Sequence, residues 1–124
     1  MASLLAIAAG GAIGALLRYW VSTATYVYLG RGFPYGTLAV NVLGSFIMGA
    51  LFVVLVERSV AVPEWRAAIL IGLLGAFTTF STFSMETVGL VEEGRLGAAV
   101  LNLALSGVLC VAACWVGLIL VRKL

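Results

Sequence analysis

The chain consists of four long apolar stretches separated by short polar segments. Charged residues mark the divisions, because a charge at the centre of a bilayer is costly and therefore collects at helix ends and in loops. A hydrocarbon core about 30 Å thick is crossed by about 20 residues of α-helix. The pattern predicts four membrane-spanning helices at roughly residues 2–28, 34–56, 66–90 and 96–121.

Short connections join the predicted helices. Residues 30–34 contain two glycines and a proline, residues 57–66 contain Pro63, and residues 92–95 read Glu-Glu-Gly-Arg, all of which are typical of turns. The first apolar stretch lacks the basic segment of a secretory signal, so we expect it to be retained. The sequence therefore predicts an all-α membrane protein with antiparallel neighbours, a single domain over residues 1–124 and no domain outside the membrane.

Composition narrows the classes of function. Apolar residues make up 64% of the 124 residues and charged residues 10%, against about 25% charge in a typical soluble domain. The net charge of +2 is too small to indicate a nucleic-acid partner. Histidine is absent, and Cys110 and Cys114 lie four residues apart, not at the spacing of a redox or zinc pair, so we expect both to be buried. The chain is not expected to be an enzyme.

Lysine and arginine divide almost evenly between the two ends of the predicted bundle. The end with both termini carries Arg58, Arg66, Arg122 and Lys123, and the other carries Arg18, Arg31 and Arg95. Such a small bias does not choose an orientation by the positive-inside rule. Two alternatives fit equally: dual topology, with copies inserted both ways, and a single topology set by the C-terminal pair.

Polar residues share faces with small residues on the first two helices. Gly11, Gly14 and Arg18 fall on one face of the first, where a charge must find a partner or line water. Asn41 shares a face with Gly44 on the second. A buried amide is costly unless it forms hydrogen bonds. It therefore either joins two helices or donates to a permeating solute.

The third predicted helix contains the most unusual stretch. Residues 72–86 read Gly-Leu-Leu-Gly-Ala-Phe-Thr-Thr-Phe-Ser-Thr-Phe-Ser-Met-Glu. Glycine and threonine weaken a helix, which predicts a break in mid-membrane where freed carbonyls face protein, water or an ion. Discontinuous helices of this kind commonly form ion sites.

The phenylalanines and hydroxyl groups of this stretch can bind an anion without a fixed cation. Ring edges carry partial positive charge and hydroxyl groups donate hydrogen bonds, while several moderate sites allow release. This favours a small, hard, strongly hydrogen-bonding anion. In the packing alternative, the rings fill space and the hydroxyls bond to their own helix. On the fourth helix, Asn102, Ser106 and Cys110 form a weaker polar stripe that either lines the same path or locks helices together.

Three motifs carry a family resemblance over essentially the whole chain. They are Gly-Gly-Ala-Ile-Gly-Ala-Leu-Leu-Arg-Tyr at 10–19, Gly-Thr-Leu-Ala-Val-Asn-Val-Leu-Gly-Ser-Phe at 36–46, and the stretch at 72–86. The sequence resembles the Fluc/CrcB fluoride channels. The resemblance implies a fluoride-selective channel for passive efflux of cytoplasmic fluoride, which lowers fluoride toxicity. It further implies an antiparallel, dual-topology homodimer with two pores in the lipid bilayer of a prokaryotic inner or plasma membrane.

The resemblance also implies roles for individual residues. The fluoride path would comprise Phe80, Phe83, Asn41, Ser81, Thr82, Ser84 and Ser106. Arg18 and Glu86 would lie at the vestibule. The main-chain carbonyls of Gly75 and Thr78 would hold a Na⁺ ion that is structural and not transported.

Two other classes compete with a channel. A small four-span multidrug-type transporter would need an acid in mid-membrane to couple protons to its substrate. The acids here, all at predicted helix ends or loops, are Glu57, Glu64, Glu86, Glu92 and Glu93. A non-transporting membrane assembly subunit would leave the hydroxyl-rich third helix unexplained.

Overall fold

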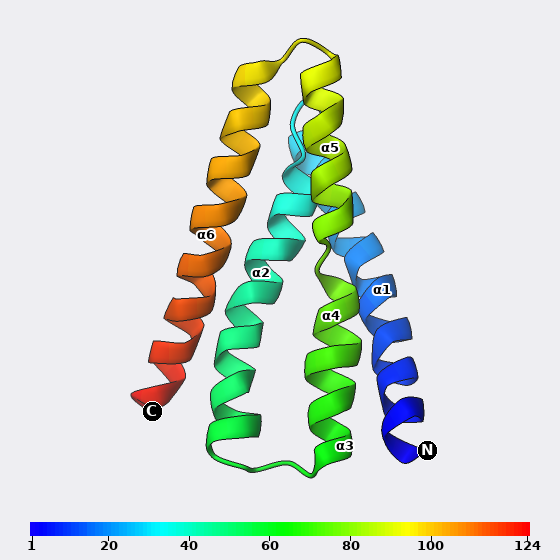
Figure 1. Cartoon of the computed structure of the whole chain (residues 1–124), viewed down its shortest axis with the longest axis vertical. Coiled ribbons are helices and arrows are strands. Elements are labelled where there is room, and N and C mark those ends of the chain that lie inside the picture. The colour runs from blue at the N-terminus through cyan, green and yellow to red at the C-terminus, as the bar shows by residue number, and fades with distance from the viewer.

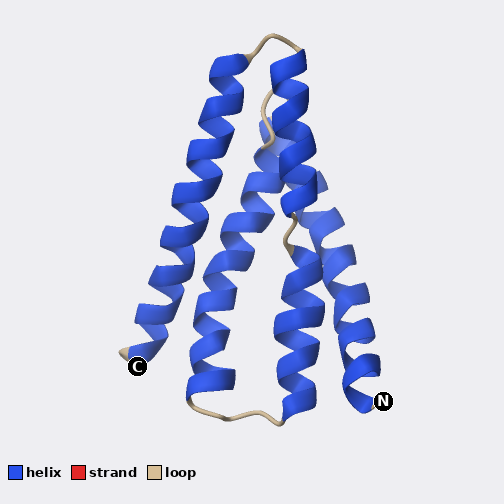
Figure 2. Cartoon of the chain, in the orientation of Figure 1, coloured by secondary structure: helices blue, strands red, loops and turns tan.

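The computed structural model describes all 124 residues and contains helices but no strands (Figure 2). Four helical segments are long and apolar enough to cross a membrane: Ala2–Leu29, Tyr35–Glu57, Pro63–Glu92 and Leu96–Arg122. The all-α fold with four helices of membrane-spanning length is therefore confirmed.

Two of the four segments are single helices and two are composite. The first is α1 (Ala2–Leu29) and the fourth is α6 (Leu96–Arg122). The second consists of α2 (Tyr35–Phe52) followed by the π-helical η1 (Val53–Glu57). The third consists of α3 (Pro63–Arg66), the π-helical η2 (Ala67–Leu73), α4 (Leu74–Phe77) and α5 (Phe80–Glu92). Pro63 begins the third segment, where its missing N–H is not needed.

Successive segments run in opposite directions. Both termini and the connection from η1 to α3 lie at one end of the molecule, and the other two connections lie at the opposite end (Figure 1). Arginines join neighbouring elements at both ends. Arg58 donates to the carbonyl of Val121 at 2.6 Å, and Arg122 forms an ion pair with Glu57. At the other end, Arg95 donates to the carbonyl of Gly32 at 2.5 Å.

Glycines bring the helices into backbone contact. A Cβ atom added at Gly49 of α2 would overlap the carbonyl oxygen of Cys114, and one at Gly117 of α6 would overlap that of Phe46. The same holds for α1, where a Cβ at Gly14 would overlap the carbonyl of Leu73 in η2. Small residues allow this approach in membranes, where the hydrophobic effect does not drive helices together. The packing of α2 on α6 and of α1 on η2 is the most extensive in the chain.

The interior of a single chain is small. Only 22 of the 124 residues are buried, and many large apolar side chains point outward. The largest side chains with almost no exposure are Leu74, Val40, Val53 and Asn102. Lipid or a second protein must therefore cover most of the apolar surface.

The glycine contact between α1 and η2 leads to a stability prediction. Gly14→Ala places a methyl group against the Leu73 carbonyl, and such overpacking costs about 1–3 kcal/mol. We expect a lower thermal midpoint for loss of the monodisperse peak in detergent on size-exclusion chromatography. Gly11→Ala is the matched control, because its Cβ would lie 3.9 Å from the nearest atom, the Gly72 oxygen, in ordinary contact. Equal midpoints for the two variants would contradict the prediction.

Candidate ion-conduction site

Two non-helical residues interrupt the third segment. Helix α4 ends at Phe77 and α5 begins at Phe80. Between them, Thr78 (φ −85°, ψ 158°) and Thr79 (φ −151°, ψ 117°) are extended, and Figure 2 shows this short stretch as a loop. The interruption falls within the hydroxyl-rich stretch of the sequence, where β-branched threonines weaken the helix.

Asn41 of α2 supplies hydrogen bonds to the interruption. Its Nδ2 donates to the carbonyl oxygen of Thr79 at 3.0 Å, and the Thr79 N–H donates to Asn41 Oδ1 at 2.8 Å. Both backbone groups of an extended residue thus find partners on a neighbouring helix. The first alternative for Asn41, an interhelical link, is observed. Because an amide nitrogen carries two hydrogens, one Nδ2 hydrogen is left for another acceptor.

Thr79 also begins α5. Its Oγ1 accepts a hydrogen bond from the N–H of Thr82 at 3.1 Å, which satisfies one of the free donors at a helix start. The same oxygen donates to Thr82 Oγ1 at 3.0 Å and lies 3.3 Å from Ser81 Oγ. Thr79 is absent from the predicted site, although a threonine before a new helical run is a recognisable capping signal.

These bonds deprive two carbonyls of their usual partners. In a continuous α-helix the N–H of Thr79 would bond to Gly75 O, and the N–H of Thr82 would bond to Thr78 O. Here the first donates to Asn41 and the second to the side chain of Thr79. Gly75 is exposed on the surface of the chain. The carbonyls of Gly75 and Thr78 are therefore oxygen donors available to a hard cation.

An open groove of about 560 Å³ runs beside the interruption, between α2, α5 and α6. It brings together four of the seven predicted path residues: Asn41, Phe80, Phe83 and Ser106. No charged residue lines it. The other three predicted path residues, Ser81, Thr82 and Ser84, lie outside the lining of this groove.

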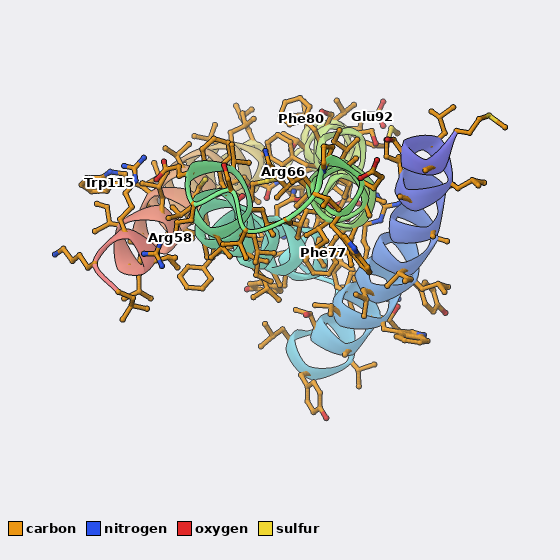
Figure 3. All side chains as sticks on the ribbon, turned by 90° about the horizontal axis from the view of Figure 1, so that it is seen from below. Arg58, Arg66, Phe77, Phe80, Glu92 and Trp115 are labelled. Atoms are coloured by element: carbon orange, nitrogen blue, oxygen red, sulfur yellow. The ribbon has the colours of Figure 1, made fainter.

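The two phenylalanines of the groove have different surroundings. Their ring centroids are 5.3 Å apart and the rings are tilted by 47°. Phe83 is 7% exposed, whereas Phe80 is 78% exposed. Viewed along the bundle, Phe80 lies at the outer edge of the molecule and Phe77 lies nearer to α1 (Figure 3). One ring is packed within the chain, and the other points out of it.

Several hydroxyl groups bond within the protein. Ser84 Oγ donates to the carbonyl of Phe80 at 2.9 Å, as the packing alternative expects. Thr87 Oγ1 donates to the carbonyl of Phe83 at 2.7 Å and accepts from Asn102 Nδ2 at 2.9 Å. Ser106 Oγ donates to Asn102 Oδ1 at 3.5 Å. Ser106 therefore lines the groove and also belongs to a buried network that joins α6 to α5.

The two predicted vestibule residues are not brought together. Glu86 lines a second groove, of about 250 Å³, near the connections at residues 30–34 and 93–95. Its Oε1 accepts a hydrogen bond from Tyr26 at 2.8 Å, and its buried Oε2 has no partner. The sequence did not indicate this contact, because Tyr26 lies 60 residues from Glu86 along the chain. Arg18 is half-buried and lines neither groove.

Comparison with protein families assigns the chain. A family model described as CrcB-like protein, Camphor Resistance (CrcB), matches residues 5–118. The chain belongs to the CrcB family. All candidate site residues, from Arg18 to Ser106, lie within the matched region.

Several proteins named fluoride-specific ion channel FluC are similar to the chain. One from Methylococcus capsulatus is 60% identical over 122 residues, which cover 98% of this chain and 54% of the relative. One from Magnetococcus marinus is 52% identical over 116 residues, 94% of each chain. One from Coxiella burnetii is 46% identical over 123 residues, 98% of this chain and 99% of the relative. The chain thus spans about half the length of the Methylococcus relative and nearly all of the other two.

The Asn41 link gives a prediction for this CrcB chain. Asn41→Ala leaves the N–H and carbonyl of Thr79 without partners, at about 1–3 kcal/mol for each buried group. We expect a lower thermal midpoint and faster hydrogen exchange at the Thr79 amide. Asn41→Asp keeps an acceptor for the Thr79 N–H but loses the donor to the Thr79 carbonyl. We therefore expect slower exchange at the Thr79 amide in this variant than in Asn41→Ala.

Ser45→Ala is the control for this prediction. It removes a polar group one turn further along α2, beside the same groove, without removing the partner of Thr79. We expect exchange at the Thr79 amide to stay as in the unmodified protein. Unchanged exchange in Asn41→Ala would mean that the link does not hold the interruption.

Proposed function

We propose that this chain forms a fluoride-selective ion channel that lets cytoplasmic fluoride leave the cell passively and so lowers its toxicity. The observation that carries the proposal is the 52% identity, over 94% of both chains, to a relative named fluoride-specific ion channel FluC. The uncharged groove beside the interrupted third segment is consistent with it.

The fluoride path follows the groove. Phe80 and Phe83 offer ring edges, the Ser106 hydroxyl lies nearby, and Asn41 has one amide hydrogen to spare. Together these groups replace part of the hydration shell of a small anion. The groove has no fixed positive charge that would bind the anion too tightly for release. Ser81, Thr82 and Ser84 extend the path along α5, and Arg18 and Glu86 act at its ends.

Flow along this path is passive. The groove contains no acid, whereas a multidrug-type transporter would need one to couple protons to its substrate. The concentration gradient and the membrane potential supply the driving force. The lack of an acid in the groove is the physical reason to prefer a channel over a multidrug-type transporter.

The functional unit is an antiparallel homodimer inserted in both orientations in a bacterial inner membrane. Phe80 points out of the chain, and the groove is open on one side, so one copy does not enclose a pathway. A second copy, inverted against the first, would cover both. The near-even division of lysine and arginine between the two ends of the chain fits insertion in either direction.

The interruption of the third segment lies within the membrane and holds a structural Na⁺ ion. The carbonyls of Gly75 and Thr78 would be its ligands, joined by those of the second copy. Both carbonyls have lost their helical partners, and neutral oxygens are the donors that a hard cation prefers. The ion would supply positive charge between the two copies and would not be transported.

Efflux from liposomes tests the channel. Purified protein in fluoride-loaded vesicles should release fluoride at channel-like rates once a potassium ionophore short-circuits the charge movement. No proton gradient should be needed, because the groove has no acid. A fluoride electrode follows the release. Chloride-loaded vesicles should retain their contents, and equal chloride release would disprove selectivity.

Two variants connect the efflux to the groove. Phe80→Ile and Phe83→Ile remove the ring edges but keep apolar side chains, so we expect slower fluoride release with unchanged elution on size exclusion. Val108→Ile is a matched control, because Val108 is exposed on α6 outside the groove lining. Unchanged flux in both phenylalanine variants would assign the rings to packing alone.

Exchange of the cation tests the Na⁺ site. We expect replacement of Na⁺ by N-methylglucamine, which is too large for a site built of carbonyls, to lower both the thermal midpoint of the assembly and the fluoride flux. Return of Na⁺ should restore both. Indifference of both measurements would contradict a role for Gly75 and Thr78, while leaving the efflux result intact.

A further inference from the structure

Three sulfur-containing side chains line the groove described above. Cys110 and Cys114 come from α6, and Met48 comes from α2. Both cysteines are free thiols and half-buried. They are the only two cysteines of the chain, so both of its thiols lie at one place.

The packing of α2 on α6 places these side chains near one another. The backbones touch where Gly49 meets the carbonyl of Cys114, so Met48, the residue before Gly49, lies at the height of Cys114. Cys110 lies one turn away on the same face of α6, where residues four apart have Cβ atoms about 5–6 Å apart. The groove thus has two thiols on one wall and a thioether on the other.

The chemistry of this set favours one class of ligand. Thiol and thioether sulfurs are soft donors that select soft cations such as Cu(I). A structural zinc site takes four ligands from thiolates and imidazoles, and this groove offers two cysteines and no histidine. No histidine, aspartate or glutamate lines the groove. The site is also free of charged groups, which disfavours any complex that leaves a net charge in this apolar environment.

We propose that Cys110, Cys114 and Met48 form a binding site for one soft monovalent metal ion, Cu(I) or its analogue Ag(I). On binding, the S–H bond of one thiol breaks, a sulfur–metal bond forms, and the proton passes to water. The second thiol and the thioether each donate a lone pair. One positive charge enters as one proton leaves, so the groove stays neutral. No oxidant or reductant takes part.

The experiment uses the purified, untagged full-length protein and Ag⁺ as the probe. After incubation with silver nitrate and a wash with excess free methionine, elemental analysis should find about one Ag⁺ per chain. A pH indicator in weak buffer should record about one proton released per Ag⁺ bound. Neither measurement depends on ion flow, so the outcome is separate from that of the proposed function.

Three variants locate the site. Cys110→Ser and Cys114→Ser should each weaken Ag⁺ binding by at least about tenfold, because loss of even an outer-shell partner in a metal site costs about that much. Met48→Leu keeps the volume of the side chain and should weaken binding several-fold. Met85→Leu, on the exposed face of α5, and Ala112→Ser, on the exposed face of α6, are the matched controls and should bind as the unmodified protein does. Circular dichroism and elution volume check that each variant is folded.

Three results would overturn the proposal. The first is two Ag⁺ per chain, which would mean that each thiol binds independently. The second is unchanged affinity in a folded Met48→Leu variant, which would remove the thioether from the site. The third is loss of all Ag⁺ in the methionine wash of the unmodified protein, which would mean that the sulfurs do not act together.

Discussion

The paired hydrogen bonds between Asn41 and the backbone of Thr79 are the interaction on which the candidate site depends. In lipid, a backbone group without a partner is costly, so a chain can leave the helical conformation only where a neighbour supplies its hydrogen bonds. The Asn41 amide meets this requirement with one donor and one acceptor. Because the Thr79 N–H is engaged there, the Gly75 carbonyl loses its helical partner. The start of α5 and the direction of Phe80 follow from the same interruption.

Close packing at glycines brings Asn41 of α2 within hydrogen-bonding distance of Thr79. The contacts at Gly49 and Gly117 fix α2 against α6, and a side chain at Gly44 would strike the Cγ2 atom of Thr78 or the ring of Phe77. The interruption can therefore lie directly against α2, within reach of Asn41. The hydrogen bonds from Asn41 depend on this close contact, because the Asn41 side chain is too short to bridge a wider gap between α2 and the interruption.

Part of this arrangement follows from sequence. The spacing of charges predicted four helices, because the cost of a buried charge acts on each position separately. The glycines and threonines at 72–86 indicated a weakened helix by their own propensities, and Asn41 stood out as an amide that needs a partner. Local preference does not say which residue becomes extended, so Thr79 was missed as both a cap and the partner of Asn41. The contact of Tyr26 with Glu86 and the placement of Met48 in one groove with two cysteines depend on how helices distant in sequence pack together.

The interruption also divides the third segment between two neighbours. Its first half, from α3 through η2 to α4, packs chiefly on α1, whereas α5 packs chiefly on α6. Thr78 and Thr79 join the halves, and their conformation is held by the bond of the Thr78 N–H to the Leu74 carbonyl and by the two bonds of Thr79 to Asn41. The angle between the two halves is thus set by the backbone of two residues and by one side chain of α2. Because packing against neighbours sets the tilt of a helix in the bilayer, the two halves of this single segment take their tilts from different helices.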